Sequence, residues 1–211
     1  MNKYYGGIYG FADGIQGQLM PDESIIWKGA PKKSAFIINS SMKLAPFALI
    51  WLLFDGFFIS TITMSGAMEH MLGFIIPFFA IHLMPVWIWI YQMITAAARW
   101  KNTEYAVTSK RIVLRNGLIG YHYQSIYYTE ISNVSLHVGA VDRMLGVGDI
   151  YILMDSHANT NKNAPVILDV EDPQQVFAIV QQTVMDIQTD IHYPNALRPD
   201  TNPGYNTQYH P

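Results

Sequence analysis

Two ionisable side chains, Asp55 and His82, lie inside two long apolar stretches of the sequence. The stretches cover residues 44–64 and 71–98, and a short link, residues 65–70, separates them. If the stretches form two antiparallel helices, Asp55 and His82 are almost equally far along the chain from the centre of the link. If these helices cross a membrane, the carboxyl group and the imidazole should lie at the same depth in it, and we expect them to interact.

Two roles are open for this intramembrane polar pair. A lone carboxylate in the middle of a membrane costs about 2.5–3.5 kcal/mol, and a facing imidazole that donates a hydrogen bond or carries the proton reduces that cost. The pair is either a proton or ion relay or a polar clasp that fixes the register of two helices. Because one pair provides no continuous path across a bilayer, the clasp is the favoured interpretation.

A second group of side chains with possible chemistry is the basic set Lys110, Arg111 and Arg115, which lies in a predicted β-hairpin. Residues 99–115 contain five basic residues and a single acid, Glu104. A basic side chain near an anionic membrane surface contributes about 1 kcal/mol of attraction. The set predicts contact with lipid phosphate, either as a general attraction that orients the domain or as a specific head-group pocket. The general attraction is favoured, because part of this charge is also a topology signal.

No motif in the sequence indicates catalysis or a bound cofactor. The sequence contains no glycine-rich phosphate loop with lysine, no His-Glu-x-x-His and no Gly-x-Ser-x-Gly. Cysteine is absent and the seven histidines are scattered, so we expect no metal site. Intramembrane aspartyl proteolysis needs two carboxylates, and Asp55 is the only one in the apolar stretches. We therefore expect no enzymatic activity and no cofactor, and the formal net charge of −3 does not indicate a nucleic-acid partner.

The two apolar stretches must position the polar pair, and each is long enough to cross a bilayer as a helix. A hydrocarbon core of about 30 Å needs about 20 apolar residues at the helical rise. Lysines and arginines flank both outer ends of the stretches, whereas the link contains none. Because basic residues next to a span stay in the cytoplasm, we predict a transmembrane helical hairpin over residues 44–98. Both termini are then cytoplasmic, in a multi-pass protein of the cell (inner) membrane.

The basic hairpin belongs to a predicted domain over residues 99–192. Residues 103–108 alternate as a half-buried strand, Ser109-Lys110 forms a turn, and the next strand leads to Asn116-Gly117, a pair typical of a type I′ turn. Gly146 and Gly148 suit a turn or bulge before the strand that contains Asp149. Further strand-like runs cover residues 118–128, 131–138, 149–154 and 166–170.

The domain is expected to end with an amphipathic helix. Asp172-Pro173 provides an N-cap and a proline at the first helical position, and apolar residues then recur at helical spacing as far as Ile191. An antiparallel sheet followed by one such helix predicts an α+β domain, namely a curled antiparallel β-barrel that the C-terminal helix caps.

Three segments of the sequence resemble the bacterial pleckstrin-homology-like (bacterial PH) domain family. They are residues 102–117 (NTEYAVTSKRIVLRNG), 142–150 (DRMLGVGDI) and, before the apolar stretches, 23–31 (ESIIWKGAP). The resemblance implies a PH-like barrel preceded by a pair of transmembrane helices, an arrangement that is common in that family. It implies little about the ligand, because barrels of this kind have many roles.

Two functions follow from the sequence as alternatives. The favoured one is a membrane-anchored PH-like binding or assembly module at the cytoplasmic face, whose partners are membrane lipid, an unidentified protein or further copies of the chain. The alternative is a subunit of an oligomeric transport or channel assembly that uses Asp55 and His82. The remaining residues are expected to form a flexible N-terminal arm (1–20), a cytoplasmic pre-membrane segment (21–43) and a disordered tail (193–211).

Overall fold

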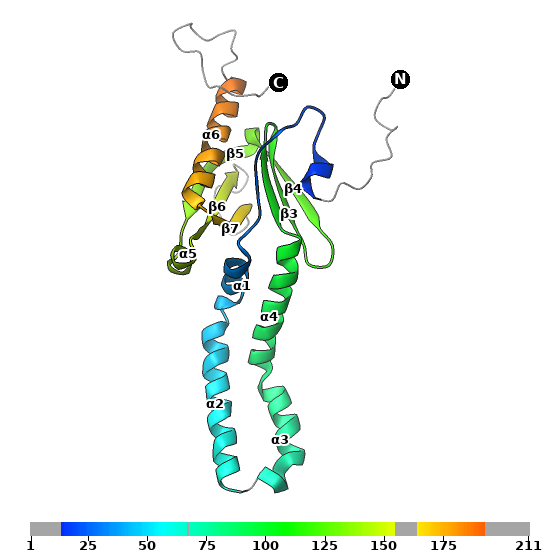
Figure 1. The fold of residues 1–211 in the computed structure, drawn as a ribbon, viewed down its shortest axis with the longest axis vertical. Helices are drawn as coiled ribbons and strands as arrows, with labels where there is room; N and C mark the ends of the chain where they lie inside the picture. Colours follow the sequence, from blue (N-terminus) through cyan, green and yellow to red (C-terminus); the bar gives the residue numbers. More distant parts are fainter. Residues whose placement is uncertain (1–13, 67, 155–163, 193–211) are drawn as a thin grey trace, which may run out of the picture. The chain divides into compact units, whose positions relative to one another are not determined.

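The computed structural model describes residues 14–66, 68–154 and 164–192, and the chain forms two compact units (Figure 1). The first unit contains the residues up to Lys32 and from Asn102 onward, and the second contains Lys33–Lys101. The second unit is therefore an insertion in the sequence of the first. The predicted tail over residues 193–211 lies outside the described residues.

The first unit contains two antiparallel sheets. One has the strand order β1-β2-β3-β4 and the other has the order β5-β6-β7. The strands of the first sheet are β1 (Ile25–Gly29), β2 (Glu104–Thr108), β3 (Arg111–Asn116) and β4 (His122–Tyr127). Those of the second sheet are β5 (Ile131–His137), β6 (Val147–Met154) and β7 (Val166–Glu171). The predicted antiparallel pairing is confirmed, but the strands do not close into a barrel.

Two local features explain why the sheet is divided. A 3-10 turn, η2 (Tyr128–Glu130), separates β4 from β5 and interrupts the ladder of hydrogen bonds there. On the other side, Asp169 in β7 has a φ of 52°, a left-handed conformation that a regular strand does not contain. The Asp169 carbonyl accepts one hydrogen bond, at 2.8 Å, from the backbone N–H of Lys32.

The C-terminal helix α6 (Pro173–His192) begins at the residue that the sequence predicted. Pro173 is the first helical residue, where a missing N–H leaves no hydrogen bond unmade. The carbonyl of Asp172 accepts hydrogen bonds from the N–H groups of Gln175 and Val176. One face of the helix joins the main apolar core of the unit through Val176, Val180, Val184 and Ile187.

The turns of the first unit follow the sequence at two places and depart from it at one. Ser109 and Lys110 connect β2 to β3 as predicted, and Gly146 has a φ of 68° at the end of the short helix α5 (Ala140–Leu145). The predicted type I′ turn at Asn116-Gly117 is wrong, because β4 begins only at His122 and neither residue has a positive φ. Gly117 is needed for a different reason, since a Cβ there would collide with the carbonyl oxygen of Gly120.

The segment before β1 differs from the flexible arm that the sequence analysis predicted for residues 1–20. Residues 1–13 lie outside the described residues, but the turn η1 (Ile15–Gln18) is packed on the first sheet. Ile15 is 0% exposed and lies with Ala106 and Val113, and its N–H donates to Glu104 Oε2 at 3.0 Å. A single apolar side chain without periodic neighbours fixes this turn, which is why no pattern predicted it.

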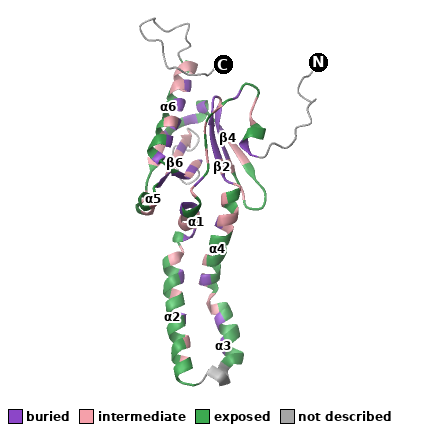
Figure 2. Cartoon of the chain, viewed as in Figure 1, coloured by how far each residue is buried: buried purple, intermediate pink, exposed green. Residues whose placement is uncertain are grey.

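The second unit is helical. Its elements are α1 (Lys33–Met42), α2 (Ala45–Met64), α3 (Met68–His82) and α4 (Met84–Lys101). By length and composition α2 could cross a membrane. Helices α3 and α4 are long and apolar enough to do so only when they are taken together as one span, which is bent by 50° between them. The second apolar stretch is therefore not one straight helix, and the predicted two-helix transmembrane hairpin stays a prediction. Figure 2 shows that buried residues concentrate in the strands of the first unit, whereas α2 is mostly exposed.

The break between α3 and α4 has a cause in the sequence. Pro85 has no N–H to donate to a carbonyl one turn earlier, and a proline disfavours helical geometry at the residue before it. Two tryptophans supply donors at the break instead. The indole N–H of Trp87 donates to the Ala80 carbonyl at 3.2 Å, and that of Trp51 donates to the His82 carbonyl at 2.8 Å.

Candidate functional site

The structure brings Asp55 of α2 and His82 of α3 into direct contact. His82 Nδ1 lies 2.9 Å from Asp55 Oδ1 and 3.2 Å from Asp55 Oδ2, and the hydrogen bond between the two side chains is formed with Oδ2. The Asp55 side chain is only 2% exposed. The contact therefore joins α2 to the end of α3 within the second unit.

Aromatic rings hold the imidazole in this position. The Phe78 ring stacks on it at a centroid distance of 5.0 Å, and the Trp51 ring lies at the same distance on a tilt of 31°. Because Trp51 also donates to the His82 carbonyl, it fixes both the backbone and the side chain of this residue. Residues 45–64 and 72–101 contain no other Asp or Glu that could continue a chain of titratable groups.

Arg111, the centre of the predicted lipid-contact set, is buried in the first unit. Its side chain donates to both carboxylate oxygens of Glu23, from Nε to Oε1 at 3.1 Å and from Nη2 to Oε2 at 3.2 Å. The remaining donors reach Ser125 Oγ at 2.9 Å and the Gln18 carbonyl at 2.6 Å. These protein acceptors occupy the guanidinium, so its geometry is that of a structural ion pair.

The Glu23 carboxylate is held by the same network. It also lies 2.7 Å from the Thr108 hydroxyl and accepts the Met20 N–H at 2.6 Å. Burial raises the pKa of Glu23, but the hydrogen bonds from Arg111, Met20 and Thr108 outweigh it, so the net effect lowers the pKa below its ordinary value. The ionised pair fastens the segment before β1 to the β2–β3 hairpin.

Lys110 and Arg115 lie at opposite ends of the central strand β3. Lys110 is in the β2–β3 turn, where its Nζ donates to the Pro21 carbonyl at 3.1 Å. Arg115 is opposite Glu104 at the other end of the hairpin, and its guanidinium lies over the Tyr121 ring, 4.5 Å from the ring centroid. The structure therefore does not gather the three basic residues into one pocket, and their contact with lipid stays a prediction.

The end of the hairpin that contains Arg115 is also where the chain leaves and re-enters the first unit. Gly29 at the end of β1 pairs with Tyr105 near the start of β2, and Asn116 pairs with His122 across the β3–β4 loop. The connections to the second unit and the loop of residues 117–121 thus lie at the same end of the strands. We call this end of the first sheet the linker edge. Asn102, the first residue after α4, donates from Nδ2 to the carbonyl of Leu118 at 3.2 Å.

The linker edge exposes apolar side chains. Ile119 at the tip of the β3–β4 loop is 98% exposed, and Leu118 and Tyr121 beside it are exposed as well. Met144 in α5 is 87% exposed, and the carbonyl of the next residue, Leu145, accepts a hydrogen bond from Lys32 Nζ at 3.0 Å. Each of the two connections to the second unit is therefore hydrogen-bonded to a segment that exposes a large apolar side chain.

A cavity of about 340 Å³ lies on another part of the first unit. It is bordered by the edge strands β1 and β7 and by the first turns of α6, and it is lined by Trp27, Gly29, Ala30, Val170, Glu171, Asp172, Gln175, Val176 and Ile179. Sequence analysis did not find it, because its walls come from segments that are far apart in the chain.

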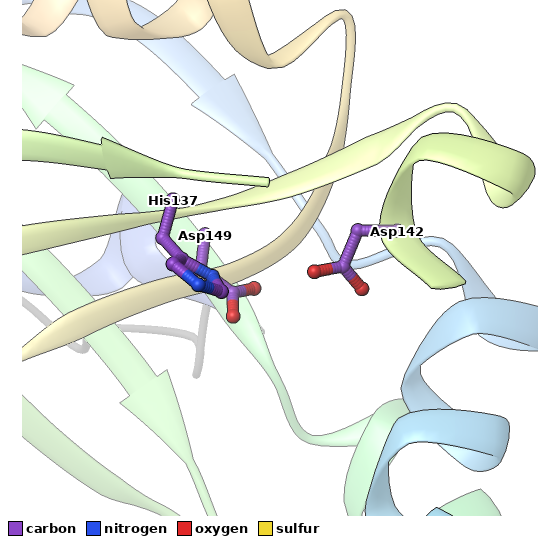
Figure 3. A group of neighbouring side chains, drawn as sticks. All are labelled: His137, Asp142 and Asp149. Carbon is purple, nitrogen blue, oxygen red and sulfur yellow. The ribbon is translucent and has the colours of Figure 1, made fainter. Parts of the chain in front are cut away.

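Sequence analysis also missed a group of three polar side chains around the β5–β6 connection. His137 and Asp149 are directly opposite each other on β5 and β6, and Asp142 comes from α5 between these strands. One ligand atom from each residue lies within 4.8 Å of the other two. Figure 3 shows Asp142 pointing from α5 toward the other two side chains. The sequence predicted no metal site, and the cross-strand register that joins His137 to Asp149 could not be read from a scattered histidine.

Backbone N–H groups orient both carboxylates of this group. Asp142 Oδ2 accepts the N–H of Gly139, the residue before α5, at 2.9 Å, and Asp149 Oδ1 accepts the N–H of Asp169 at 2.9 Å. Burial raises the pKa of Asp149, and the negative charge of Asp142 adds to this effect. The Asp169 N–H and the charge of His137 act in the opposite direction and are outweighed. Imidazole and carboxylate together form a donor set suited to a divalent transition metal.

Comparison with known proteins identifies one family and one solved structure. The sequence model of the family described as "Bacterial PH domain" matches residues 50–184. The chain is also similar to the crystal structure of a DUF1696 family protein with a pleckstrin-homology domain from Shewanella loihica PV-4. That similarity has 16% sequence identity and a TM-score of 0.30, and it covers 41% of this chain and 71% of the other. No curated protein matches the chain.

Proposed function

We propose that this chain, which belongs to the bacterial PH domain family, is a binding or assembly module that its second unit anchors in a membrane. The PH-like first unit then lies at the cytoplasmic face. Family membership supports the binding or assembly role, and the absence of a catalytic motif in the sequence is consistent with it. The anchor and the orientation are argued from the residues of the second unit.

The observation that carries the anchor is the exposure of the apolar side chains on α2. Only 11% of the most apolar window of this helix is buried, so α2 is not the core helix of the unit. A water-soluble protein rarely exposes a contiguous apolar surface of this extent, whereas lipid satisfies it on all sides. The large exposed side chains include Phe47, Leu49, Ile50, Leu52, Leu53, Phe54, Phe57 and Phe58.

The charges next to the helices support a cytoplasmic first unit. Lys33 and Lys43 flank α1 and the start of α2, and Arg99 and Lys101 lie in the last turn of α4. Basic residues within a short distance of a span are retained in the cytoplasm. The α2–α3 link has no basic residue, so we place it on the outer side.

Lipid contact is then expected at the linker edge of the first unit. Both connections to the membrane helices start at this edge, which limits its distance from the lipid surface to a few residues of chain. Ile119 and Met144 are exposed apolar groups that insert into the interfacial region at low cost, whereas Arg115 is mostly buried between Glu104 and the Tyr121 ring and offers little of its charge to the head groups. Lys110, at the opposite end of β3, is then expected to face water, which departs from the lipid contact that the sequence suggested for it.

A transport or channel role has less support than an anchor. Asp55 and His82 contact each other within one chain, and aromatic rings of the same chain pack around the imidazole. Such a closed contact suits a clasp that holds α2 to α3. A path across the membrane would need several copies of the chain and further polar groups.

The proposed anchor is tested by membrane extraction and by single cysteines. The chain has no natural cysteine, so each introduced thiol is unique. Full-length protein should remain in bacterial membranes after an alkaline carbonate wash and should be released only by detergent. In intact cells, a membrane-impermeant maleimide should label Ser65→Cys in the link and should not label Lys110→Cys until the cells are opened. Release by carbonate, or labelling of Lys110→Cys in intact cells, would contradict the proposal.

A further inference from the structure

We propose that His137, Asp142 and Asp149 bind one divalent transition-metal ion of the Zn²⁺ class at the β5–α5–β6 connection. The three residues come from three consecutive elements and lie within a short segment of chain (Figure 3). Their ligand atoms lie within 4.8 Å of one another. Neither the family nor the proposed membrane anchor requires such a site, so this inference is independent of both.

The distances require only small movements of the side chains. Nitrogen and oxygen ligands bind Zn²⁺ at about 2.0–2.2 Å, so two ligands of one ion lie at most about 4.3 Å apart. His137 is exposed and is the last residue of β5, so its imidazole can turn toward the carboxylates by leaving its edge-to-face contact with the Tyr151 ring. Side-chain rotations of His137 and the two aspartates that shorten each distance by up to about 0.5 Å would bring all three ligand atoms within this limit.

The donor set selects the kind of ion. Imidazole is a ligand for transition metals such as Zn²⁺, whereas Mg²⁺ and Ca²⁺ prefer oxygen ligands alone. Two carboxylates balance the charge of one divalent ion, and a neutral imidazole adds none. Three protein ligands leave at least one position for water or for a group from a partner.

The surroundings of the carboxylates are those of metal ligands with oriented outer-shell partners. The N–H groups of Gly139 and Asp169 each hold one carboxylate oxygen, and this type of contact orients metal ligands in known sites. The two carboxylates repel each other, and among the ion pairs of the described residues none joins Asp149 to a lysine or arginine. A bound cation would supply the missing counter-charge for this half-buried group.

The expected consequence of binding is a fixed connection between the strands. The Gly139 N–H contact with Asp142 lies within the start of α5 itself, and Lys32 holds the carbonyl of Leu145 at the other end of the helix. A metal bound to residues of β5, α5 and β6 would add a direct link among all three elements. Opening of α5 should then become rarer when the ion is present.

The inference is tested with the full-length protein in detergent, stripped of metal with a chelator and titrated with Zn²⁺ in a calorimeter. The variants are His137→Ala, which alters an exposed side chain, and Asp149→Asn and Asp142→Asn, which retain an oxygen acceptor for the backbone N–H groups. His122→Ala is the matched control, because His122 is an exposed histidine at the end of another strand. Hydrogen exchange of α5 is measured with and without Zn²⁺ as a second readout.

We expect one Zn²⁺ per chain in the unaltered protein and in His122→Ala, with binding at least tenfold weaker in His137→Ala and in each Asn variant. Exchange of the α5 amides should slow on addition of Zn²⁺ only where the site is intact, and Mg²⁺ should not substitute. The inference is overturned if the unaltered chain has no stoichiometric site. It is also overturned if His137→Ala binds as the unaltered chain does, or if His122→Ala weakens binding equally, since the ion is then held by surface histidines in general.

Discussion

Replacing Arg111 with Met should destabilise the first unit strongly, because the change leaves a buried carboxylate without its cation. The methionine side chain retains most of the apolar stem of arginine and removes the guanidinium. Glu23 then loses two hydrogen bonds from Arg111, and the acceptors on Ser125 and Gln18 lose one donor each. The Glu23 side chain is 0% exposed, so water does not replace these contacts.

The expected magnitude follows from the burial of the pair. Removing one partner of a buried ion pair costs about 3–5 kcal/mol, because the other charge stays buried and uncompensated. Arg115→Met is the matched control on the same strand. Its guanidinium lies 3.9 Å from Glu104 Oε2 and over the Tyr121 ring. Glu104 keeps a second cation, Lys28 Nζ at 2.6 Å, and the N–H of Ile15, so the change leaves no unpaired carboxylate and should cost about 1 kcal/mol.

Hydrogen exchange of the β2 and β3 amides measures both effects in the full-length protein. Core strands exchange through opening of the whole unit, so their protection factors report its stability. Arg111→Met should lower protection by about two to three and a half orders of magnitude, at about 1.4 kcal/mol for each factor of ten. Arg115→Met should lower it by less than about tenfold. Equal losses in the two variants, or a loss below tenfold in Arg111→Met, would refute the reasoning.

Three further predictions concern other parts of the chain. His82→Leu should lower the melting temperature in detergent more than Asp55→Ala, because it leaves the buried Asp55 carboxyl group without its partner, and a double-mutant cycle without coupling would contradict the clasp. Gly117→Ala should cost about 1–3 kcal/mol through collision with the Gly120 carbonyl, whereas Gly120→Ala, with open space around its Cβ, should be nearly neutral in urea unfolding. The pKa of Glu23 is lower in the folded protein than its ordinary 4.5, so the stability that the ionised group contributes is lost as the pH falls below that value. The pKa of Asp149 is higher than its ordinary 3.8, so the stability that the protonated group contributes is lost as the pH rises above that value. In melting temperatures measured against pH, Glu23→Gln should remove the loss of stability at low pH, and Asp149→Asn should remove the loss at rising pH.

Local patterns predicted the elements that depend on local signals. The β2–β3 hairpin follows from alternation around Ser109 and Lys110, and the start of α6 follows from Asp172-Pro173. Both rest on hydrogen bonds between residues that are close in the chain. The break at Leu83 was also present locally, in Pro85, but the apolar composition on both sides concealed it.

Features that depend on contacts across the chain could not be predicted in this way. The partner of β1 is β2, which is separated from it by the whole second unit, and the partner of Arg111 is Glu23 on the far side of the same insertion. A cluster of basic residues in the sequence therefore suggested a lipid site, although the central arginine is used for an internal ion pair. The contact between Asp55 and His82 was accessible because it depends only on equal chain distances from one link.

The strand register explains why the candidate metal ligands were not found. His137 and Asp149 lie opposite each other only because the chain between β5 and β6 contains the short helix α5. The sequence analysis predicted only a turn or bulge at Gly146 and Gly148 and no helix between these strands, so it did not place Asp142 beside them. A histidine that looks isolated in the sequence is in this fold next to two carboxylates.

The membrane anchor and the placement of the linker edge are tested most directly by depth-dependent fluorescence quenching in lipid vesicles. Single cysteines at Phe57, Ile119 and Lys110 of the full-length protein would carry an environment-sensitive fluorophore, and the quenchers would be lipids with nitroxides at defined depths. We predict that the label at Phe57 is quenched by deep nitroxides, that the label at Ile119 is quenched by shallow ones, and that the label at Lys110 is quenched by neither. Quenching at Phe57 without quenching at Ile119 would contradict the linker edge alone, and no quenching at Phe57 would contradict the membrane anchor itself.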